Sequence, residues 1–166
     1  MNTKKNIPFS PPDISESEVE MVAGALRSGW ITTGPRTKEF EHEIATFCRT
    51  SRAVCLNSAT ACMELILRVL GVGPGDEVIV PAYTYTATAS VVYHVGAKVV
   101  MVDTAPDSFE MDYDRMEEAI TPATKVVIPV DLGGVMCDYD RVFAAVERKR
   151  SLFRPAGKLQ EAIGRG

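Results

Sequence analysis

Four small residues, Asn57, Ser58, Ala59 and Thr60, stand between an apolar run and a predicted helix. Side chains of this size let a ligand approach the backbone closely, and the free N–H groups at a helix start, with two hydroxyls, can bind a phosphate dianion. A simpler interpretation is that Ser58 or Thr60 only caps the helix. The pattern by itself favours capping, because cap residues are common and the run contains no GxGxxG, GKS or GKT motif.

Two tyrosines form a second candidate site in the stretch VPAYTYTATAS, residues 80 to 90. They follow a predicted strand and precede a predicted helix. Tyr85 is placed to lay its ring on a flat ligand, because neighbouring strand ends of one sheet point into the same crevice. The alternative is that Tyr83 and Tyr85 are partly buried wedges under the helix, and the residues alone do not separate the two interpretations.

The stretch VDLGGVMCDYD, residues 130 to 140, is a third candidate. Gly133 and Gly134 can break a strand and bring the backbone close to a ligand. Asp131 could serve as an acid or a base, although a turn or capping role is favoured because Asp is common in turns. Asp138 is a predicted helix cap.

The patterns around the histidines and serines argue against a metal site and against a serine hydrolase. Neither His42 nor His94 has a Cys or carboxylate partner at metal-ligand spacing, so we expect no metal site. The sequence has no GxSxG nucleophile elbow, which lowers the expectation of an esterase or lipase.

Composition and charge limit the partners of the chain. Its 166 residues carry a net charge of −4 and 46% hydrophobic residues, without the basic stripe that a nucleic-acid partner would need. No apolar stretch approaches a membrane span, and the first residues lack the apolar core of a secretory signal. We therefore expect a cytoplasmic protein with no nucleic-acid or membrane partner. Its four cysteines lack a CxxC pair, and we expect reduced thiols in the core.

Apolar runs and helical patterns alternate along the chain, and these elements must position the candidate residues. The runs are rich in Val and lack polar alternation, which is typical of a parallel sheet buried on both faces. Ligands of such α/β folds collect at the carboxyl edge of the sheet. We predict helices at 15 to 28 and 37 to 48, then strand 53 to 56, helix 60 to 70, strand 77 to 80, helix 86 to 95, strand 98 to 102, helix 112 to 120, strand 125 to 130 and helix 138 to 148.

Several segments in order resemble the N-terminal half of the DegT/DnrJ/StrS aminotransferases. The matching segments are SGWITTGPRTKEFEHEIA, AVCLNSATACMELIL, GVGPGDEVIVPAYTYTATASVVYHVGAKVVMVDTAPDSFEMD and VVIPVDLGGVMCDYDRV. The resemblance implies pyridoxal 5'-phosphate (PLP) as cofactor, a nucleotide-linked keto sugar as acceptor and glutamate or glutamine as amino donor. It also implies a homodimer and the large domain of the aspartate aminotransferase-like fold type I.

The resemblance gives roles to particular residues. It assigns the cofactor phosphate to the loop of Ser58, Ala59 and Thr60, and stacking on the pyridine ring to Tyr85.

Residues 32 to 34 receive a weaker assignment. The loop of Thr32, Thr33 and Gly34 lies near the active site in relatives and often reaches across a dimer.

Two groups that the chemistry needs are missing from these 166 residues. The family has a Schiff-base lysine in an SxxxxK setting and an aspartate in a DAAH- or DAAQ-like motif that holds the pyridine nitrogen protonated. No lysine or aspartate here occupies such a setting, so we predict no catalytic residue in this chain. We expect a truncated large domain without the small C-terminal domain.

The predicted partial domain has three segments. They are N-terminal helices and a loop at 1 to 50, an alternating core at 51 to 150, and a basic, solvated tail at 151 to 166.

Two alternatives to an enzyme fragment stay open. The chain could be an inactive domain that only binds phosphate or a partner chain. A Rossmann-type domain would fit the alternation, but the glycine fingerprint after the strand at 53 to 56 is missing. A sheet with an open, Val-rich edge predicts aggregation or obligate pairing.

Overall fold

A computed structural model describes residue 8 and residues 10–163, which form two compact units, one up to Cys55 and one from Leu56 onward. The elements are α1 (Glu16–Arg27), α2 (Pro35–Phe47), α3 (Ala59–Leu70), β1 (Glu77–Pro81), α4 (Ala87–His94), β2 (Lys98–Val102), α5 (Tyr113–Glu118), β3 (Thr124–Val127), α6 (Tyr139–Arg148) and α7 (Lys158–Ile163), with short 3₁₀ turns at Leu132–Gly134 and Arg150–Leu152. Within the described residues no helix is long and apolar enough to cross a bilayer.

The first unit contains α1 and α2. A capping box starts α1 as predicted, since the Ser15 amide donates to the Glu18 carboxylate at 2.7 Å and the Ser15 hydroxyl accepts from the Ser17 amide. The helix ends just before Gly29, whose φ of +76° suits glycine. The second helix starts at Pro35, earlier than the predicted residue 37, because proline fits the first helical position.

The strand predicted at residues 53 to 56 is wrong. These residues are irregular, and Val54 is 73% exposed. A strand needs a neighbour for its backbone hydrogen bonds, and none lies beside this segment in the described part of the chain. Its Cys55 amide donates instead to the Glu41 carboxylate of α2 at 2.9 Å.

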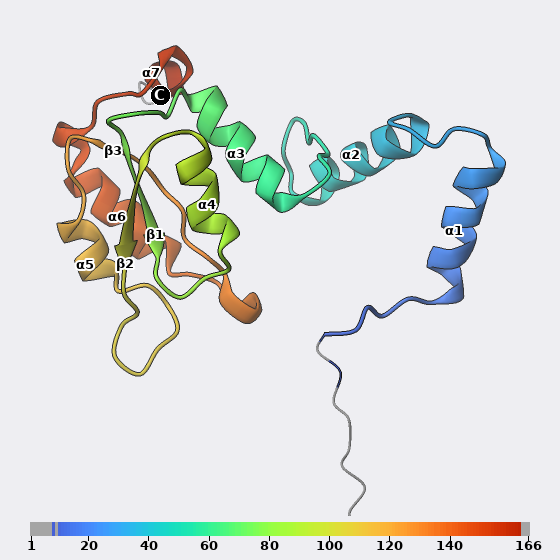
Figure 1. The fold of residues 1–166 in the computed structure, drawn as a ribbon, viewed down its shortest axis with the longest axis horizontal. Coiled ribbons are helices and arrows are strands. Elements are labelled where there is room, and N and C mark those ends of the chain that lie inside the picture. The colour runs from blue at the N-terminus through green and yellow to red at the C-terminus, as the bar shows by residue number, and fades with distance from the viewer. Residues whose placement is uncertain (1–7, 9, 164–166) are drawn as a thin grey trace, which may run out of the picture. The chain divides into compact units, whose positions relative to one another are not determined.

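The second unit is a three-layer α/β arrangement around a parallel sheet of order β2-β1-β3 (Figure 1). The central strand β1 alternates between two cores. Val78 and Val80 face the helices α3 and α4, while Ile79 faces α5 and α6, and all three side chains are fully buried. The predicted mainly parallel sheet flanked by helices is therefore confirmed, apart from its first strand.

Helix boundaries in this unit follow the predicted signals closely. Gly71 ends α3 with a φ of +85°, Asp112 caps α5, and Asp138 caps α6 by accepting from the Arg141 amide at 3.0 Å. The last strand is shorter than predicted, because pairing with β1 ends after the Ile128 amide donates to Ile79.

The segment after α6 is only partly the solvated tail that its charge predicted. Arg154 and Lys158 are exposed, but Gln160 is buried. Its amide donates to the Lys125 carbonyl at 2.7 Å and its oxygen accepts from the Ala156 amide at 2.7 Å, which fastens α7 beside β3.

The cysteines are free thiols in the structure, but they are not all in the core as predicted. Cys137 is buried, Cys55 and Cys62 are half-buried, and Cys48 is exposed at the end of α2.

Candidate functional site

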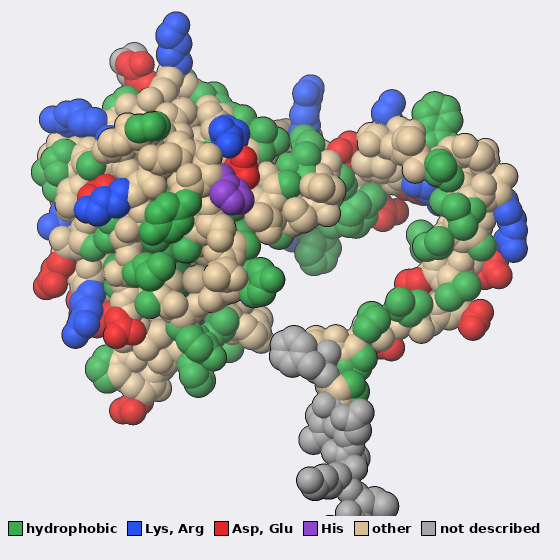
Figure 2. Space-filling view, viewed as in Figure 1, with side chains coloured by type: hydrophobic (Ala, Val, Ile, Leu, Met, Phe, Trp, Pro, Cys, Tyr) green, Lys and Arg blue, Asp and Glu red, His purple; other side chains and the backbone are tan. Residues whose placement is uncertain are grey.

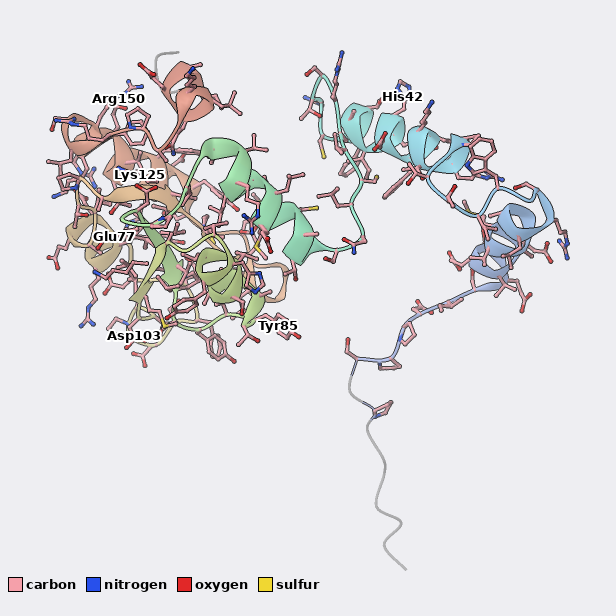
Figure 3. All side chains as sticks on the ribbon, turned by 45° about the horizontal axis from the view of Figure 1, so that its top comes forward. His42, Glu77, Tyr85, Asp103, Lys125 and Arg150 are labelled. Atoms are coloured by element: carbon pink, nitrogen blue, oxygen red, sulfur yellow. The ribbon has the colours of Figure 1, made fainter. Side chains whose placement is uncertain are left out.

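The carboxyl ends of the three strands lie together on one side of the α/β unit. Figure 3 places Tyr85 and Asp103 at this end, whereas Glu77 and Lys125, from the starts of β1 and β3, lie toward the other. Parallel strands make this arrangement unavoidable, because all their carboxyl ends face the same way. The predicted crevice residues after β1, β2 and β3 are thus on one edge.

Ser58 caps α3 as the simpler interpretation predicted. Its extended backbone lets its hydroxyl oxygen accept from the Ala61 amide at 3.1 Å, and its carbonyl accepts from the Cys62 amide at 3.1 Å. Capping leaves the hydroxyl proton available to donate.

The backbone amides of the next two residues, Ala59 and Thr60, are hydrogen-bond donors at the start of α3. Among the described residues no group accepts from the amides of Ala59 or Thr60, and Ala59 is exposed. With the Ser58 hydroxyl, these amides form a cluster of donors at the positive end of a 12-residue helix. We call Ser58, Ala59 and Thr60 the α3 cradle.

Tyr85 is not a buried wedge, since its side chain is 79% exposed in the loop before α4. The loop is held by its backbone, because the Tyr85 carbonyl accepts from the Thr88 amide at 3.1 Å. The hydroxyls of Thr84 and Thr88 lie 2.8 Å apart and add a second link. The Tyr85 ring is thus left free on a loop that is fixed at both ends.

Thr32, Thr33 and Gly34 belong to the other compact unit. The two threonines are exposed, and Gly34 is buried under the indole ring of Trp30. The Trp30 indole nitrogen donates to the Thr33 carbonyl at 3.1 Å, so these residues form one compact turn before α2.

Asp131 has the turn role that its position favoured. One of its oxygens accepts from the Cys137 amide at 2.9 Å, and the Tyr139 hydroxyl donates to both oxygens. The hydrogen bond from the Cys137 amide is the main reason that the pKa of Asp131 is lowered. Asp131 therefore closes the loop after β3, and nothing in this arrangement prepares it to take up a proton.

The lysines of the sheet lie at the opposite edge. Lys98 begins β2 and binds the Glu77 carboxylate at 2.8 Å. Lys125, whose side chain is 7% exposed, lies 3.7 Å from Asp76. Both amines therefore lie at the amino edge of the sheet, away from Tyr85 and Asp103.

Sequence reasoning missed one contact between helices. His94 of α4 lies 2.8 Å from Glu64 of α3, and Arg68 binds the same carboxylate at 2.7 Å. Arg68 first, and then His94, lower the pKa of Glu64. The residues are 30 positions apart, so no local pattern could have revealed the pair. Within residues 8 and 10–163, no three metal-ligating side chains form a group that could hold an ion.

Together these features define a class, an α/β protein with unpartnered amide donors at the start of the helix before its parallel sheet and an exposed aromatic ring at the carboxyl end of that sheet. Residues 12–153 match the model of the DegT/DnrJ/EryC1/StrS aminotransferase family. The match covers most of the chain, and the chain belongs to this family.

Individual relatives agree with that assignment. The chain is 40% identical over 149 residues to the spore coat polysaccharide biosynthesis protein SpsC of Bacillus subtilis, covering 89% of this chain and 38% of SpsC. It is 44% identical over 142 residues to the UDP-4-amino-4-deoxy-L-arabinose–oxoglutarate aminotransferase of Shewanella sediminis, covering 86% and 37%.

The fold has solved counterparts. Spr1654 of Streptococcus pneumoniae, assigned as a sugar aminotransferase, matches with a TM-score of 0.92 and 62% identity over 96% of this chain and 40% of its own. It has been solved in apo, pyridoxamine phosphate (PMP) and PLP forms. The chain thus has the fold of the N-terminal part of PLP-binding, fold type I aminotransferases and spans about two fifths of the length of the relatives it matches.

Proposed function

We propose that a protein carrying this chain transfers an amino group from glutamate or glutamine to a keto sugar linked to a nucleotide, with PLP as cofactor. Family membership supports the aminotransferase chemistry, and the relative from S. sediminis, by its name, acts on a UDP-linked amino sugar. SpsC is, by its name, a spore coat polysaccharide biosynthesis protein, which supports a role in polysaccharide biosynthesis. The resemblance further supports a cytoplasmic homodimer.

The observation that carries the proposal is the α3 cradle. A phosphate dianion needs several donors and a positive potential, and the cradle offers two unpartnered amides, the hydroxyls of Ser58 and Thr60, and a helix N-terminus. The residues present therefore fit the phosphate group of PLP. When bound, PLP carries the amino group covalently and accepts electrons from the bonds next to it.

The four candidate cofactor residues have distinct roles in this proposal. Ser58, Ala59 and Thr60 hold the phosphate through hydroxyl and amide donors. Tyr85 orients the cofactor by stacking on its ring, which contributes about 1 kcal/mol beyond burial.

A second candidate function is favoured by the positions of Lys98 and Lys125 at the opposite edge of the sheet. In that view the 166 residues alone bind phosphate compounds or a partner chain without transferring amino groups. The two candidates do not exclude each other, because the first concerns amino transfer by a longer protein and the second concerns binding by these 166 residues alone.

The experiment compares PMP with pyridoxamine, which lacks the phosphate, by calorimetric titration of the chain. PMP is chosen because it has no aldehyde that could react with surface lysines. We expect PMP to bind at least tenfold more tightly, and Thr60→Val to weaken it roughly tenfold by removing a donor to a charged group. The matched control is Ser151→Ala, an exposed serine in the turn after α6.

Equal affinities for PMP and pyridoxamine would contradict the proposal that the α3 cradle binds the cofactor phosphate.

Transamination is tested in a protein that carries this chain together with the lysine and aspartate motifs of the family. We expect visible absorbance after PLP addition and amino transfer from glutamate, whereas the 166 residues alone should give no turnover. A longer protein that stays colourless with PLP would reject the enzymatic proposal.

A further inference from the structure

The loop of residues 82 to 86, which we call the Tyr85 loop, lacks backbone hydrogen bonds in its middle. Its first amide donates to the Val102 carbonyl at the end of β2 at 2.8 Å, and the Tyr85 carbonyl accepts from the Thr88 amide at 3.1 Å. Among the described residues, no group accepts from the amides of residues 83 to 85. The two ends of the loop are therefore fixed, but its backbone does not fix the position of its middle.

An aromatic contact holds the middle of the Tyr85 loop. The ring of Tyr83 stacks on the ring of Phe109, with centroids 5.4 Å apart and an interplanar angle of 29°. Two rings in such an arrangement attract each other beyond the burial of their surfaces. The side chains are 54% and 69% exposed, so this contact is not part of a packed core. The stack thus links the middle of the Tyr85 loop to the loop after β2.

Phe109 stands on a loop that its own hydrogen bonds close. The Ala105 amide donates to the Glu110 carbonyl at 3.0 Å, and nearer the sheet the Asp112 amide donates to the Asp103 carbonyl at 2.9 Å. Hydrogen bonds between the two arms of a loop limit the conformations that the loop can adopt. The loop after β2 is therefore a fixed support for the Phe109 ring.

Tyr113 fastens the same loop to a third element. Its side chain is buried, and its hydroxyl donates to the Glu110 carboxylate at 2.8 Å and accepts from the amide of Asp138, the cap of α6, at 2.8 Å. Burial, and then the hydrogen bond to Glu110, raise the pKa of Tyr113, so the hydroxyl keeps the proton that it donates. The loop that carries Phe109 is thus tied to α6 as well as to the sheet.

We propose that Phe109 is a positioning residue for Tyr85, because its ring holds the middle of the Tyr85 loop through Tyr83 and so limits where the Tyr85 ring can lie. Tyr113 supports this role by fixing the loop on which Phe109 stands. The inference rests on the proposed function for what the Tyr85 ring contacts. The hold on the loop itself is measured without any cofactor.

The first test is amide hydrogen exchange, measured by NMR on the 166-residue chain. The Thr88 amide is the reporter, because opening of the Tyr85 loop breaks its hydrogen bond to the Tyr85 carbonyl. Phe109→Leu keeps an apolar side chain but removes the ring stack, and it should raise the Thr88 exchange rate roughly fivefold. Phe109→Tyr retains a ring and should restore the original rate.

Controls separate local opening from a general loss of stability. Phe143→Leu makes the same change at a phenylalanine of α6 that is 68% exposed and lies beside Tyr139, so Thr88 exchange should stay unchanged. The Cys62 amide in α3 should exchange at one rate in all variants. A Thr88 rate in Phe109→Leu equal to that in Phe143→Leu would overturn the inference.

Tyr113→Phe tests the support of the Phe109 loop. It removes the hydroxyl that joins Glu110 to the Asp138 amide, and it should raise Thr88 exchange by a smaller factor than Phe109→Leu, because it acts through Phe109. If Thr88 exchange did not change in the folded Tyr113→Phe variant, the role assigned to Tyr113 would be wrong.

The second test titrates PMP and pyridoxamine into the same variants. Phe109→Leu should weaken both ligands by a similar factor of roughly two to five and keep their ratio, because both carry the pyridine ring that Tyr85 contacts in the proposed function. Thr60→Val should change the ratio instead. Affinities in Phe109→Leu equal to those in Phe143→Leu would reject Phe109 as a positioning residue for the cofactor.

The inference and the proposed function fail in different measurements. Equal affinities of the unaltered chain for PMP and pyridoxamine would reject the phosphate site, and Thr88 exchange would still decide whether Phe109 holds the Tyr85 loop. A clear preference for PMP, together with unchanged Thr88 exchange in Phe109→Leu, would reject this inference alone.

Discussion

At the residue scale, Gly34 shows how a missing side chain shapes a turn. A Cβ at this position would lie 2.0 Å from the indole nitrogen of Trp30, which is far inside van der Waals contact. The glycine is extended, with a φ of −167°, so close packing and not backbone strain requires it. The neighbouring Thr32 and Thr33 stay exposed because Trp30 covers Gly34 instead of them.

We predict that Gly34→Ala displaces Trp30 and breaks its 3.1 Å hydrogen bond to the Thr33 carbonyl. The lost hydrogen bond and packing should destabilise this turn by about 1 kcal/mol. Trp30 is the only tryptophan, so its fluorescence reports the change directly as a shift in emission maximum.

The control for that substitution is Gly24→Ala within α1. A Cβ there meets nothing within 4 Å, and alanine favours a helix over glycine by about 1 kcal/mol. Emission should stay unchanged in this variant. An unshifted spectrum in Gly34→Ala would contradict the packing of Trp30 on Gly34.

At the element scale, Glu77 joins the starts of three strands. It is the first residue of β1, accepts from Lys98 at the start of β2 at 2.8 Å, and accepts from Thr121 just before β3 at 2.7 Å. Its side chain is 13% exposed, whereas Lys98 is 71% exposed, so water screens much of the Lys98 contribution. The hydrogen bonds from Lys98 and Thr121 to Glu77 thus link the three strands at the amino edge of the sheet, and we call them the polar lock.

We predict that Glu77→Gln lowers the free energy of unfolding by about 1 kcal/mol at pH 7. The hydrogen bonds from Lys98 and Thr121 lower the pKa of Glu77 below its ordinary value of 4.5. A lowered pKa gives stability that is fully present above the ordinary value and is lost as the pH falls through the folded value. In urea titrations, the difference in free energy of unfolding between Glu77→Gln and the unaltered chain should therefore become smaller below about pH 4.5.

Glu147→Gln is the control for the lock. Glu147 is 69% exposed and 3.6 Å from an exposed Arg150, so its substitution should change stability by less than about 0.5 kcal/mol. If Glu77→Gln were no more destabilising than Glu147→Gln at pH 7, the lock would have no energetic role.

At the scale of the whole molecule, the second unit exposes many large apolar side chains. Figure 2 shows several separate groups of hydrophobic side chains among polar ones on the visible face of this unit. A cavity of about 330 Å³ beside β3 and α6 is lined by Val127, Phe143 and Val146 among others, and Phe143 is 68% exposed. In the described sheet β2 and β3 are both edge strands, and an edge strand beside an apolar groove favours association.

We predict that the 166-residue chain self-associates in solution, through the apolar groove of β3 and α6. Phe143→Glu places a charge there and should shift the chain toward monomer in light scattering coupled to size-exclusion chromatography.

Tyr93→Glu is the matched control for self-association, since Tyr93 is equally exposed on α4 and lines no part of the groove. This variant should remain associated. A compact, well-behaved monomer of the unaltered chain would refute the prediction.

Local patterns in the sequence determined most of the elements. The box of Ser15 and Glu18, the cap residues Asp112 and Asp138, and the glycine after α3 act within one turn of helix, so they could be interpreted without the fold. The alternation of Val-rich runs with helices likewise predicted a parallel sheet and placed Tyr85 near its edge, whereas the position predicted for Ser58 depended on a strand at residues 53 to 56 that does not form.

Only the tertiary structure decided which contacts join distant residues. Residues 53 to 56 look like a strand, but a strand exists only when a neighbour completes its hydrogen bonds, and none does so in the described residues. The burial of Gln160 against β3 and the stacking of Tyr83 on Phe109 also depend on packing between separate loops. Residues that are close in the sequence determine the hydrogen bonds within a turn, whereas contacts between separate loops form only when the chain closes across the sheet.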